Sequence, residues 1–285
     1  MIFCKGASEI KLMTLNTHSH IEDNYQEKLH VFAEAVLAEM PDIIAMQEVN
    51  QSSDGEIISS SAMDGYISSG GVIKTDNHAL NAVNLISEAG VNYNWTYLPI
   101  KNGYGCFDEG LAVLSRTPID ETESFTVSFT DSYSDWKTRK ILGIRTMDEW
   151  FYSVHLGWWD DEADPFEKQW KRLNGIVSKR KRAWLMGDFN NPAQIRNEGY
   201  DLIKESGWHD SFELAQSRDS GVTVNKPIDG WHGRNCPGNG LRIDCIFTNT
   251  VRNILSSQVI FNEKNYPVVS DHYGIITEVK GGVEL

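Results

Sequence analysis

Short apolar segments typical of β-strands recur along the chain, and several of them end in polar residues of the kinds that carry chemistry. An apolar strand that ends in Asp, Asn, Glu or His holds a polar group rigidly at the rim of a sheet, where ligands of α/β proteins usually bind. This layout predicts a site built on strand ends, and its residue types predict metal-assisted hydrolysis of phosphate esters. The clearest segments are Met46-Gln47-Glu48-Val49, Met186-Gly187-Asp188-Phe189-Asn190 and Ser270-Asp271-His272-Tyr273.

Most predicted strands follow one another directly in the sequence, which favours antiparallel pairing. Helical spacing is confined to residues 25–40, residues 78–88 and a helix that opens at Asp164-Pro165. Two stacked sheets with these helices on their outer faces fit this order of elements. The strands are expected at residues 10–16, 42–49, 93–100, 110–115, 124–130, 140–146, 150–156, 182–186, 242–248, 258–261 and 274–279.

The first helix has the clearest boundaries. Asn24 followed by Glu27 predicts a capping box at its start, and Pro41 ends it. The stretch over residues 51–77 is rich in Ser, Gly and Asp, so we expect a long loop beside Glu48. One hypothesis is that this loop closes over the site as a lid.

Composition places the chain among ordinary globular proteins. It has 285 residues, 40% of them hydrophobic and 23% charged, and we expect residues 1–285 to form one domain. The formal net charge of −14 provides no overall positive field for a nucleic acid. The run Lys179-Arg180-Lys181-Arg182 is basic, but its position after a helix favours a solvated face that complements the helix dipole over a nucleic-acid patch.

Cysteine usage and the N-terminal segment bear on the compartment. Cys4, Cys106, Cys236 and Cys245 form no C-x-x-C pair, which favours a reduced setting. Residues 1–15 lack the pattern of a signal peptide, and the chain has no apolar stretch of about 18 residues. We therefore expect a cytoplasmic protein without a membrane partner.

Two strand-end residues are candidate metal ligands. Magnesium prefers carboxylate and carbonyl oxygens and takes only one or two protein carboxylates. Glu48 ends one predicted strand, and Asn16 ends the preceding strand and offers an amide oxygen nearby if the two strands are neighbours. Each residue alone is more often a surface or capping group, so their shared position is what favours a metal site.

Asp188 and Asn190 lie two residues apart and therefore face the same side of their strand, toward a phosphate or its attacking water. An Asx-turn is the alternative interpretation. His272 needs a partner that fixes its tautomer before it can accept a proton. The expected partner is Asp244, a carboxylate inside an apolar run where an unpaired charge would be costly.

His155 and Arg139 are candidate phosphate ligands. Strand-forming apolar residues flank His155, so a core histidine bonded to the backbone is the alternative. If a carboxylate such as Glu109 keeps it protonated, His155 would neutralise charge on the phosphoryl oxygens. Arg139 offers a second contact with bidentate geometry.

In seven ordered segments that span nearly the whole chain, the sequence resembles the endonuclease/exonuclease/phosphatase superfamily. Its members cleave phosphate esters with magnesium. The resemblance implies an α/β fold, a four-layer sandwich of two mainly antiparallel sheets flanked by helices. The segments are Leu15-Asn16, Gln47-Glu48, Glu109-Gly110-Leu111-Ala112-Val113-Leu114-Ser115, His155, Gly187-Asp188-Phe189-Asn190, Arg242-Ile243-Asp244 and Ser270-Asp271-His272.

The resemblance also implies roles for the matching residues. Glu48, aided by Asn16 and Asp271, would bind Mg²⁺, with Mn²⁺ as the alternative. The proton acceptor would be either Asp188 or His272. Cys245 departs from the aromatic residue that is usual at its position in the family. The implied catalytic pairs are a base dyad of His272 with Asp244, Asp188 with Asn190 to position water and phosphate, and His155 with Glu109 to stabilise the transition state.

Further segments resemble the maltose 6'-phosphate phosphatase group of the superfamily. Exposed indoles of Trp158, Trp159 and Trp231 would stack on sugar rings, and Asp160 or Asp229 would bind hydroxyls. Packing inside the protein is the alternative for each tryptophan. These segments are Leu15-Asn16-Thr17-His18, Thr138-Arg139-Lys140, His155-Leu156-Gly157-Trp158-Trp159-Asp160, Asn190-Asn191-Pro192 and Pro227-Ile228-Asp229-Gly230-Trp231.

The favoured hypothesis is a magnesium-dependent phosphatase that hydrolyses a sugar phosphate monoester, with maltose 6'-phosphate or a related disaccharide phosphate as substrate. The first alternative is a DNA-cleaving phosphodiesterase, an exonuclease or abasic-site endonuclease with the same centre. A lipid phosphodiesterase is disfavoured because the sequence has no amphipathic membrane-docking segment. A non-catalytic binding module is disfavoured because Glu48, Asp188 and His272 are all present.

Overall fold

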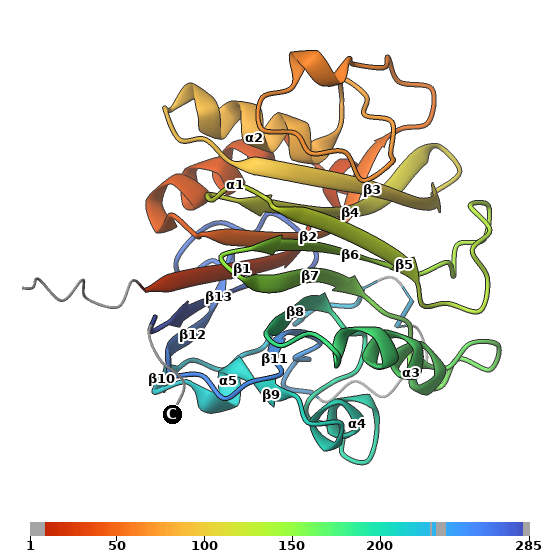
Figure 1. The fold of residues 1–285 in the computed structure, drawn as a ribbon, viewed down its shortest axis with the longest axis vertical. Coiled ribbons are helices and arrows are strands. Elements are labelled where there is room, and N and C mark those ends of the chain that lie inside the picture. The colour runs from red at the N-terminus through yellow and green to blue at the C-terminus, as the bar shows by residue number, and fades with distance from the viewer. Residues whose placement is uncertain (1–8, 229, 232–237, 282–285) are drawn as a thin grey trace, which may run out of the picture.

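A computed structural model describes residues 9–228, 230–231 and 238–281, which form two stacked β-sheets with helices on their outer faces (Figure 1). The strands of sheet A, in spatial order, are β10 (Ser217–Arg218), β12 (Ile254–Ile260), β13 (Gly274–Val279), β1 (Ile10–Asn16), β2 (Ile43–Ser52), β4 (Phe107–Ser115) and β3 (Asn94–Gly103). Those of sheet B are β5 (Glu121–Thr126), β6 (Lys140–Thr146), β7 (Glu149–His155), β8 (Ala183–Asp188), β11 (Asp244–Thr248) and β9 (His209–Asp210).

The helices lie outside the two sheets. Among the described strands, β1–β2, β7–β8 and β10–β12 pair in parallel and the other neighbours are antiparallel. No helix in the described part of the chain has the length and apolar composition needed to cross a bilayer. The helices are α1 (Tyr25–Glu39), α2 (His78–Glu88), α3 (Phe166–Val177), α4 (Gly199–Glu205) and α5 (Ser211–Leu214), with short 3-10 helices η1 (Ser19–Ile21) and η2 (Ser60–Ala62).

Three hydrophobic clusters separate the four layers. Alternate residues of a strand point to opposite faces, so Leu12 and Ile43 pack between the two sheets. Met13 and Ile44 pack on the other face of sheet A, against α1 and α2. The third cluster joins sheet B to α3 and α4 through residues such as Trp170. The predicted α/β sandwich of two mainly antiparallel sheets flanked by helices is confirmed.

Two predicted helix starts differ in outcome. Asn24 precedes α1, but its backbone is left-handed, with φ 57°, and its side chain makes no capping hydrogen bond. The predicted capping box is therefore wrong, because a capping side chain requires an extended backbone at that position. At α2, Asn77 does cap the helix, accepting a hydrogen bond from Leu80 N at 3.1 Å.

Residues 127–138 leave sheet B, although a strand was predicted as far as residue 130. Strand β5 ends at Thr126. Phe129 N then donates to Asp164 Oδ2 at 2.7 Å, which draws the backbone toward the start of α3 and away from the sheet. The short elements α4, α5, β9 and β10 were not predicted, because segments this short show no usable periodicity.

The long loop after β2 runs along the edge of sheet A. Trp95 N on the edge strand β3 donates to Gly65 O at 2.9 Å, and Ile67 N donates to Trp95 O at 2.8 Å. Sheet edges expose unpaired backbone groups that favour aggregation unless they are covered. The described contacts of this loop therefore protect β3.

Candidate active site

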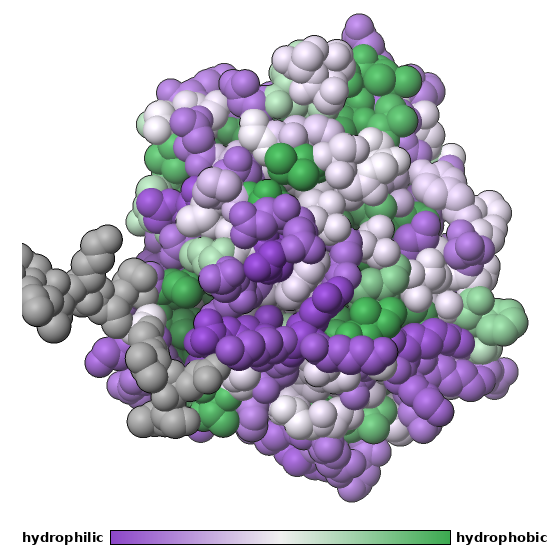
Figure 2. Space-filling model, viewed as in Figure 1, coloured by the Kyte–Doolittle hydropathy of each residue, from purple (hydrophilic) through white to green (hydrophobic). Residues whose placement is uncertain are grey.

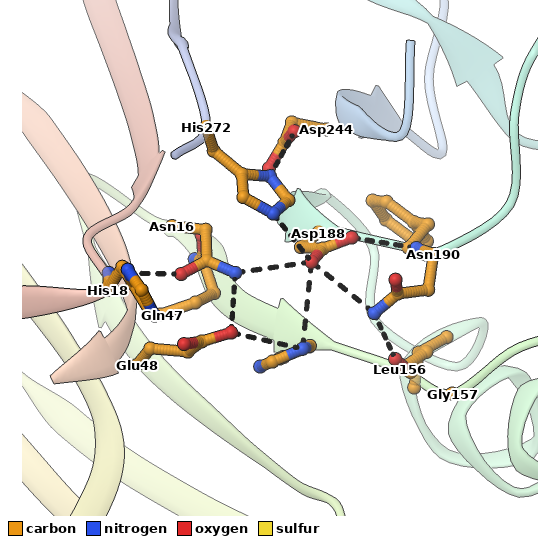
Figure 3. A network of polar contacts seen from close by, with 12 residues as sticks. Asn16, His18, Gln47, Glu48, Leu156, Gly157, Asp188, Asn190, Asp244 and His272 are labelled. Carbon is orange, nitrogen blue, oxygen red and sulfur yellow. Dashed lines mark hydrogen bonds and ion pairs between the residues drawn. The ribbon is translucent and has the colours of Figure 1, made fainter. Parts of the chain in front are cut away.

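Polar residues at the ends of strands from both sheets lie together in one network (Figure 3). In sheet B, the parallel register of β7 and β8 places His155 beside Asp188. The antiparallel register of β8 and β11 places Asp244 on the other side of Asp188. In sheet A, Asn16 at the end of β1 faces Gln47 of β2. Strand register alone thus puts Asp188 at the centre of the site.

A β-bulge turns Glu48 toward this centre. The pairing of β2 with β4 shifts register between Met46 and Val49, and Glu48 itself has a left-handed backbone, with φ 50°. Bulges redirect side chains next to functional sites, and strained backbone concentrates there. As a result, Glu48 Oε1 accepts a hydrogen bond from Asn16 Nδ2 at 2.9 Å.

The Asp188 carboxylate is the hub of the polar network in Figure 3. Its Oδ1 accepts a hydrogen bond from Asn190 N at 2.8 Å. Its Oδ2 lies 3.2 Å from Asn16 Nδ2 and 3.3 Å from Asn190 Nδ2. The Nε2 atoms of His155 and His272 lie 3.6 and 3.9 Å from the same oxygen. All five residues are buried, so this is an interior network rather than a surface cluster.

Gly187 permits the close approach of β7 and β8. Its φ is 148°, and a Cβ at this position would lie 2.0 Å from Val154 O. Any side chain would therefore push the two parallel strands apart. Since His155 and Asp188 immediately follow Val154 and Gly187, this glycine keeps both functional groups within reach of each other.

Trp231 fixes the amide of Asn190. The indole Nε1 donates to Asn190 Oδ1 at 3.0 Å, and Asn190 Nδ2 donates to Leu156 O at 3.0 Å. These contacts leave the amide nitrogen directed at Asp188. Asn190 has a left-handed backbone, with φ 50°, so both its main chain and its side chain are held in one arrangement.

Crowded carboxylates make the centre electron-rich. Burial, reinforced by the charge of Asp244, raises the pKa of Asp188 to about 7. Burial and the charge of Glu109 raise the pKa of Glu48. Within the described residues, Asp244 Oδ1 has no hydrogen-bond partner. Buried oxygen donors with uncompensated negative charge fit a hard divalent cation, which would relieve their repulsion.

The two site histidines differ in charge. Burial opposes protonation of His272, but Asp244 Oδ2 at 2.9 Å from Nδ1, together with Asp188, raises its pKa well above the usual range. For His155, burial and the nearby positive charge of Arg139 lower the pKa well below that range. Burial and the surrounding charges thus shift the pKa values of the two histidines in opposite directions, upward for His272 and downward for His155.

The predicted pairing of His155 with Glu109 is wrong. The carboxylate of Glu109 pairs with Lys101, at 3.1 Å, because the register of β3 and β4 places these two residues opposite each other. The charge of Lys101 also contributes to the low pKa of His155. The carboxylates of Asp188 and Glu48 lie 3.6 and 3.9 Å from His155 Nε2, but burial and the surrounding positive charges keep the pKa of His155 low, which favours the neutral imidazole.

Asp271 lies at the rim of the site with a third histidine, His18. His18 Nδ1 is 2.7 Å from Glu22 Oε1 and 3.8 Å from Asp271 Oδ1. Burial opposes protonation of His18, but Glu22 and the nearby carboxylates raise its pKa to about 9. Within the described residues, two trios bring ligand atoms within 4.8 Å of one another: His18, Glu22 and Asp271, and Asp188, Asp244 and His272.

Asn16 is placed between two acidic groups but presents its nitrogen to them. Asn16 Nδ2 donates to both Glu48 and Asp188, while Oδ1 accepts a hydrogen bond from His18 N at 3.3 Å. A role as an oxygen ligand therefore requires rotation of the amide. In the arrangement described, Asn16 stabilises two neighbouring carboxylates by hydrogen bonding.

A pocket of about 240 Å³ opens directly onto the network. Its lining includes the predicted residues Glu48, Glu109, Arg139, His155, Trp158, Asp188, Asn190, Asp271 and His272. Residues 51–77 contribute nothing to this lining, so the segment shows no lid contact with the pocket. Lys101, Tyr104 and Trp136 also line it.

The predicted exposed tryptophans are mostly buried. Trp158 and Trp231 are each 7% exposed, because both pack in a small apolar cluster with Ile228. Trp159 is half-buried and lies with the exposed Asp160 in a neighbouring hollow. Asp229 lies outside the described residues.

Sequence reasoning missed three residues that shape the pocket. Lys101 lies in an apolar strand, a position that marks a buried cation in need of a carboxylate. His18 lies two residues after Asn16, within a segment that had been noted without assigning it a role. Trp136, three residues before Arg139, had no strand or motif to mark it.

The sequence matches the Endonuclease/Exonuclease/phosphatase family over residues 13–272. The chain belongs to this family. Members are metal-dependent phosphoric ester hydrolases, and so is this protein. The buried oxygen donors of the site fit that requirement for a divalent metal.

Solved structures share this fold. An endonuclease/exonuclease/phosphatase family protein from Leptotrichia buccalis is 30% identical, with TM-score 0.83, covering 95% of this chain and 99% of its own. Mannosyl-6-phosphatase Bt3783 from Bacteroides thetaiotaomicron is 18% identical, with TM-score 0.60, and the match covers 95% of this chain and 99% of that protein's chain. TDP2 from Caenorhabditis elegans is 15% identical, with TM-score 0.57, and the match covers 96% of this chain and 75% of that protein's chain. A search of curated proteins found no match.

Proposed function

We propose that this family member is a magnesium-dependent phosphatase that hydrolyses a sugar phosphate monoester, with maltose 6'-phosphate or a related disaccharide phosphate as substrate. The observation that carries the proposal is the pocket. A cationic and aromatic wall, with Arg139, Lys101 and Trp158, faces the acidic network. Such a wall binds a small phosphorylated ligand that has apolar ring faces.

Two further observations support a sugar phosphate. Segments such as Thr138-Arg139-Lys140 resemble the maltose 6'-phosphate phosphatase group. A structure of the same fold carries the name mannosyl-6-phosphatase. The net charge of −14 disfavours a polyanionic polymer, while a single phosphate group needs only a local cationic contact.

In this proposal, Glu48 holds the cation with Asp271, and Asn16 either completes the ligand set or orients Glu48. When bound, the cation polarises the phosphoryl group and offsets the charge that develops on it. Arg139 binds phosphoryl oxygens, and the neutral imidazole of His155 donates one hydrogen bond to them. Asn190 holds Asp188 in place through its two donors.

Of the two candidate proton acceptors, the charges favour Asp188. A general base works best when its pKa lies near the working pH, and the pKa of Asp188 is raised to about 7. Asp244 raises the pKa of His272, which favours its protonated form and makes it a poorer proton acceptor. In the proposed step, Asp188 accepts a proton from water as the water oxygen attacks phosphorus and the phosphorus–sugar oxygen bond breaks, and the departing sugar oxygen takes up a proton from solvent to leave as the alcohol. His272 then acts by orienting Asp188.

The test is a substrate screen with purified protein in Mg²⁺ and in EDTA. We expect phosphate release from disaccharide and hexose phosphates in Mg²⁺, and none in EDTA. Nucleotides and aryl phosphates provide comparison monoesters. Absence of turnover for every sugar phosphate, beside turnover of another ester class, would reject the proposed substrate while keeping the family chemistry.

The second candidate function is a DNA-cleaving phosphodiesterase that uses the same centre. The basic run after α3 is the observation that favours it, since cations that track a phosphate backbone strengthen binding. This run lies at the beginning of β8, whereas Asp188 lies at the end of the same strand. Cleavage of duplex oligonucleotides with steep salt dependence would support this alternative over the phosphatase.

A further inference from the structure

Residues 127–138 form an anchored wall beside the pocket. Lys101 Nζ donates to Trp136 O at 2.9 Å. Asn102 N donates to Tyr133 O at 2.8 Å, and Tyr133 also bonds to the side chain of Asp108. These contacts tie the segment to β3 and β4 of sheet A. Phe129 N is bonded to Asp164 on the other side, so the segment is fixed at both ends.

On this wall, the side chain of Trp136 is exposed while its backbone is anchored. Its side chain is 54% exposed, although it lines the pocket. Phe129 on the same segment is even more exposed but does not line the pocket, so what distinguishes Trp136 is an exposed indole face within reach of a ligand bound there. Because its carbonyl accepts a hydrogen bond from Lys101, the backbone that carries the indole is held in place, so less backbone ordering is needed when a ligand packs on it.

An ordered row of side chains leads from the phosphate-binding region to Trp136. The guanidinium carbon of Arg139 lies 5.7 Å from the ring centroid of Trp158. The centroid of Trp158 lies 6.0 Å from that of Trp136, with the planes at 53°. A ligand whose phosphate contacts Arg139 therefore meets the buried Trp158 first and the exposed Trp136 farther out.

The surroundings of Trp136 suit a sugar ring. Sugar rings combine an apolar face with polar hydroxyls at the edge, so they pack on indoles where hydrogen-bonding groups are close. Asn102 and Tyr104 line the pocket with Trp136 and offer an amide and a phenol. Lys137 Nζ lies 5.4 Å from the indole centroid, but it is paired with Asp161 at 2.6 Å. This pairing leaves less positive charge for a nucleic-acid backbone.

We propose that Trp136 is the platform of an outer subsite, which packs against the second, unphosphorylated ring of a disaccharide phosphate bound through Arg139. The subsite rests on the proposed function and deepens it, because it makes Trp136 a specificity-determining residue. It separates disaccharide phosphates from hexose phosphates, which carry the same phosphorylated ring and end before the platform.

The experiment compares Trp136→Ala, Trp136→Tyr and Phe129→Ala with the wild type on maltose 6'-phosphate and glucose 6-phosphate. Phe129 is a matched control, because it is 83% exposed on the same segment and is not among the lining residues of the pocket. We expect Trp136→Ala to lower kcat/KM for maltose 6'-phosphate about tenfold, mainly through KM. The kcat/KM of Trp136→Ala for glucose 6-phosphate should change less than about twofold. Trp136→Tyr should recover most of the kcat/KM that Trp136→Ala loses on maltose 6'-phosphate, and Phe129→Ala should match the wild type on both sugars.

Other outcomes overturn the inference in distinguishable ways. Equal losses on both sugars would mean that Trp136 supports Arg139 or the fold and selects no second ring. No loss on either sugar would remove the subsite while leaving a sugar phosphatase. Turnover of oligonucleotides alone, reduced by Trp136→Ala, would assign the indole to base stacking, and the proposed function would fail with the subsite.

Discussion

The two ends of strand β8 present opposite kinds of surface. The strand begins after Arg182, beside a hollow of about 540 Å³ that is lined mainly by cations, including Arg145, Lys179 and Arg180. It ends at Asp188, beside the pocket of about 240 Å³. The larger and more highly charged hollow is therefore not the one that adjoins the buried polar network.

The difference lies in how the charges are compensated. At the basic end, Arg180 pairs with Glu123 and lies 4.6 Å from the ring centroid of Trp150, and Arg145 pairs with Glu121. Solvent screens such exposed pairs, so they contribute little to stability. At the other end, buried carboxylates face one another, and the pKa of Asp188 rises to about 7. Uncompensated buried charge, rather than hollow size or charge density, marks the candidate site.

On the face shown in Figure 2, hydrophobic side chains are interspersed among hydrophilic ones, without one continuous apolar surface of the kind that docks on lipid.

The largest expected effect is at the centre of the network. Asp188→Asn removes the proposed proton acceptor with little change of shape, so we expect kcat to fall by about 10²–10⁴. The melting temperature should stay the same or rise, because the variant no longer buries a carboxylate whose ionisation is disfavoured. Steady-state kinetics and calorimetry check both parts. Retention of the wild-type kcat would show that Asp188 takes no part in proton transfer.

A smaller effect is expected from the support of Asn190. Trp231→Phe keeps the apolar packing but removes the indole donor to Asn190 Oδ1. We expect kcat to fall about tenfold with KM nearly constant, since the amide no longer holds Asp188 in one orientation. Trp150→Phe at the basic end is the matched control and should leave kcat within about twofold. Similar losses in both variants would point to general destabilisation.

The third prediction concerns stability in EDTA. The pKa of His18 is raised to about 9 from an ordinary value of 6.5, so its stabilising contribution is complete below pH 6.5 and is lost as pH rises toward 9. The difference in unfolding free energy between the wild type and His18→Gln should therefore shrink by about 1–3 kcal/mol over that interval. Arg145→Gln at the basic end should show no such dependence, because arginine does not titrate there. Denaturant titrations at both pH values measure this, and parallel curves for His18→Gln would contradict it.

The smallest effect is expected at the basic run. Lys179 and Lys181 are exposed, so the double variant Lys179→Gln/Lys181→Gln should change kcat/KM for sugar phosphates by less than about twofold. Cleavage of oligonucleotides by the same variant, measured across a series of salt concentrations, tests whether the basic end of β8 binds substrate. Loss of a steep salt dependence in such an assay would give the basic end a role in substrate binding.

The layered fold could be predicted because its signals are local. The apolar runs of β1 and β2 and the helical spacing that ends at Pro41 depend only on neighbouring residues. Several members of the site were also predictable, because His155, Asp188 and Asp244 each end or begin an apolar strand.

Most of what failed depended on pairing between distant segments. The partner of Glu109 is decided by the register of β3 and β4, which no local pattern specifies. The exposure of a tryptophan depends on what packs against it. Trp231 is therefore buried, while Trp136, which was not predicted as a site residue, is exposed to solvent. The course of residues 127–138 is set by a contact between Phe129 and Asp164, 35 positions apart in the sequence.

The central claim is that the buried carboxylates at the end of β8 and in the bulge of β2 form the metal-dependent hydrolytic centre. A Mg²⁺ titration of phosphate release by the wild type and Glu48→Gln tests it most directly, since the variant keeps the hydrogen-bonding shape of the side chain and removes its charge. We expect the variant to need at least about tenfold more Mg²⁺ for half-maximal activity and to lose about 10²-fold or more in kcat. An unchanged Mg²⁺ dependence together with the wild-type kcat would contradict the claim.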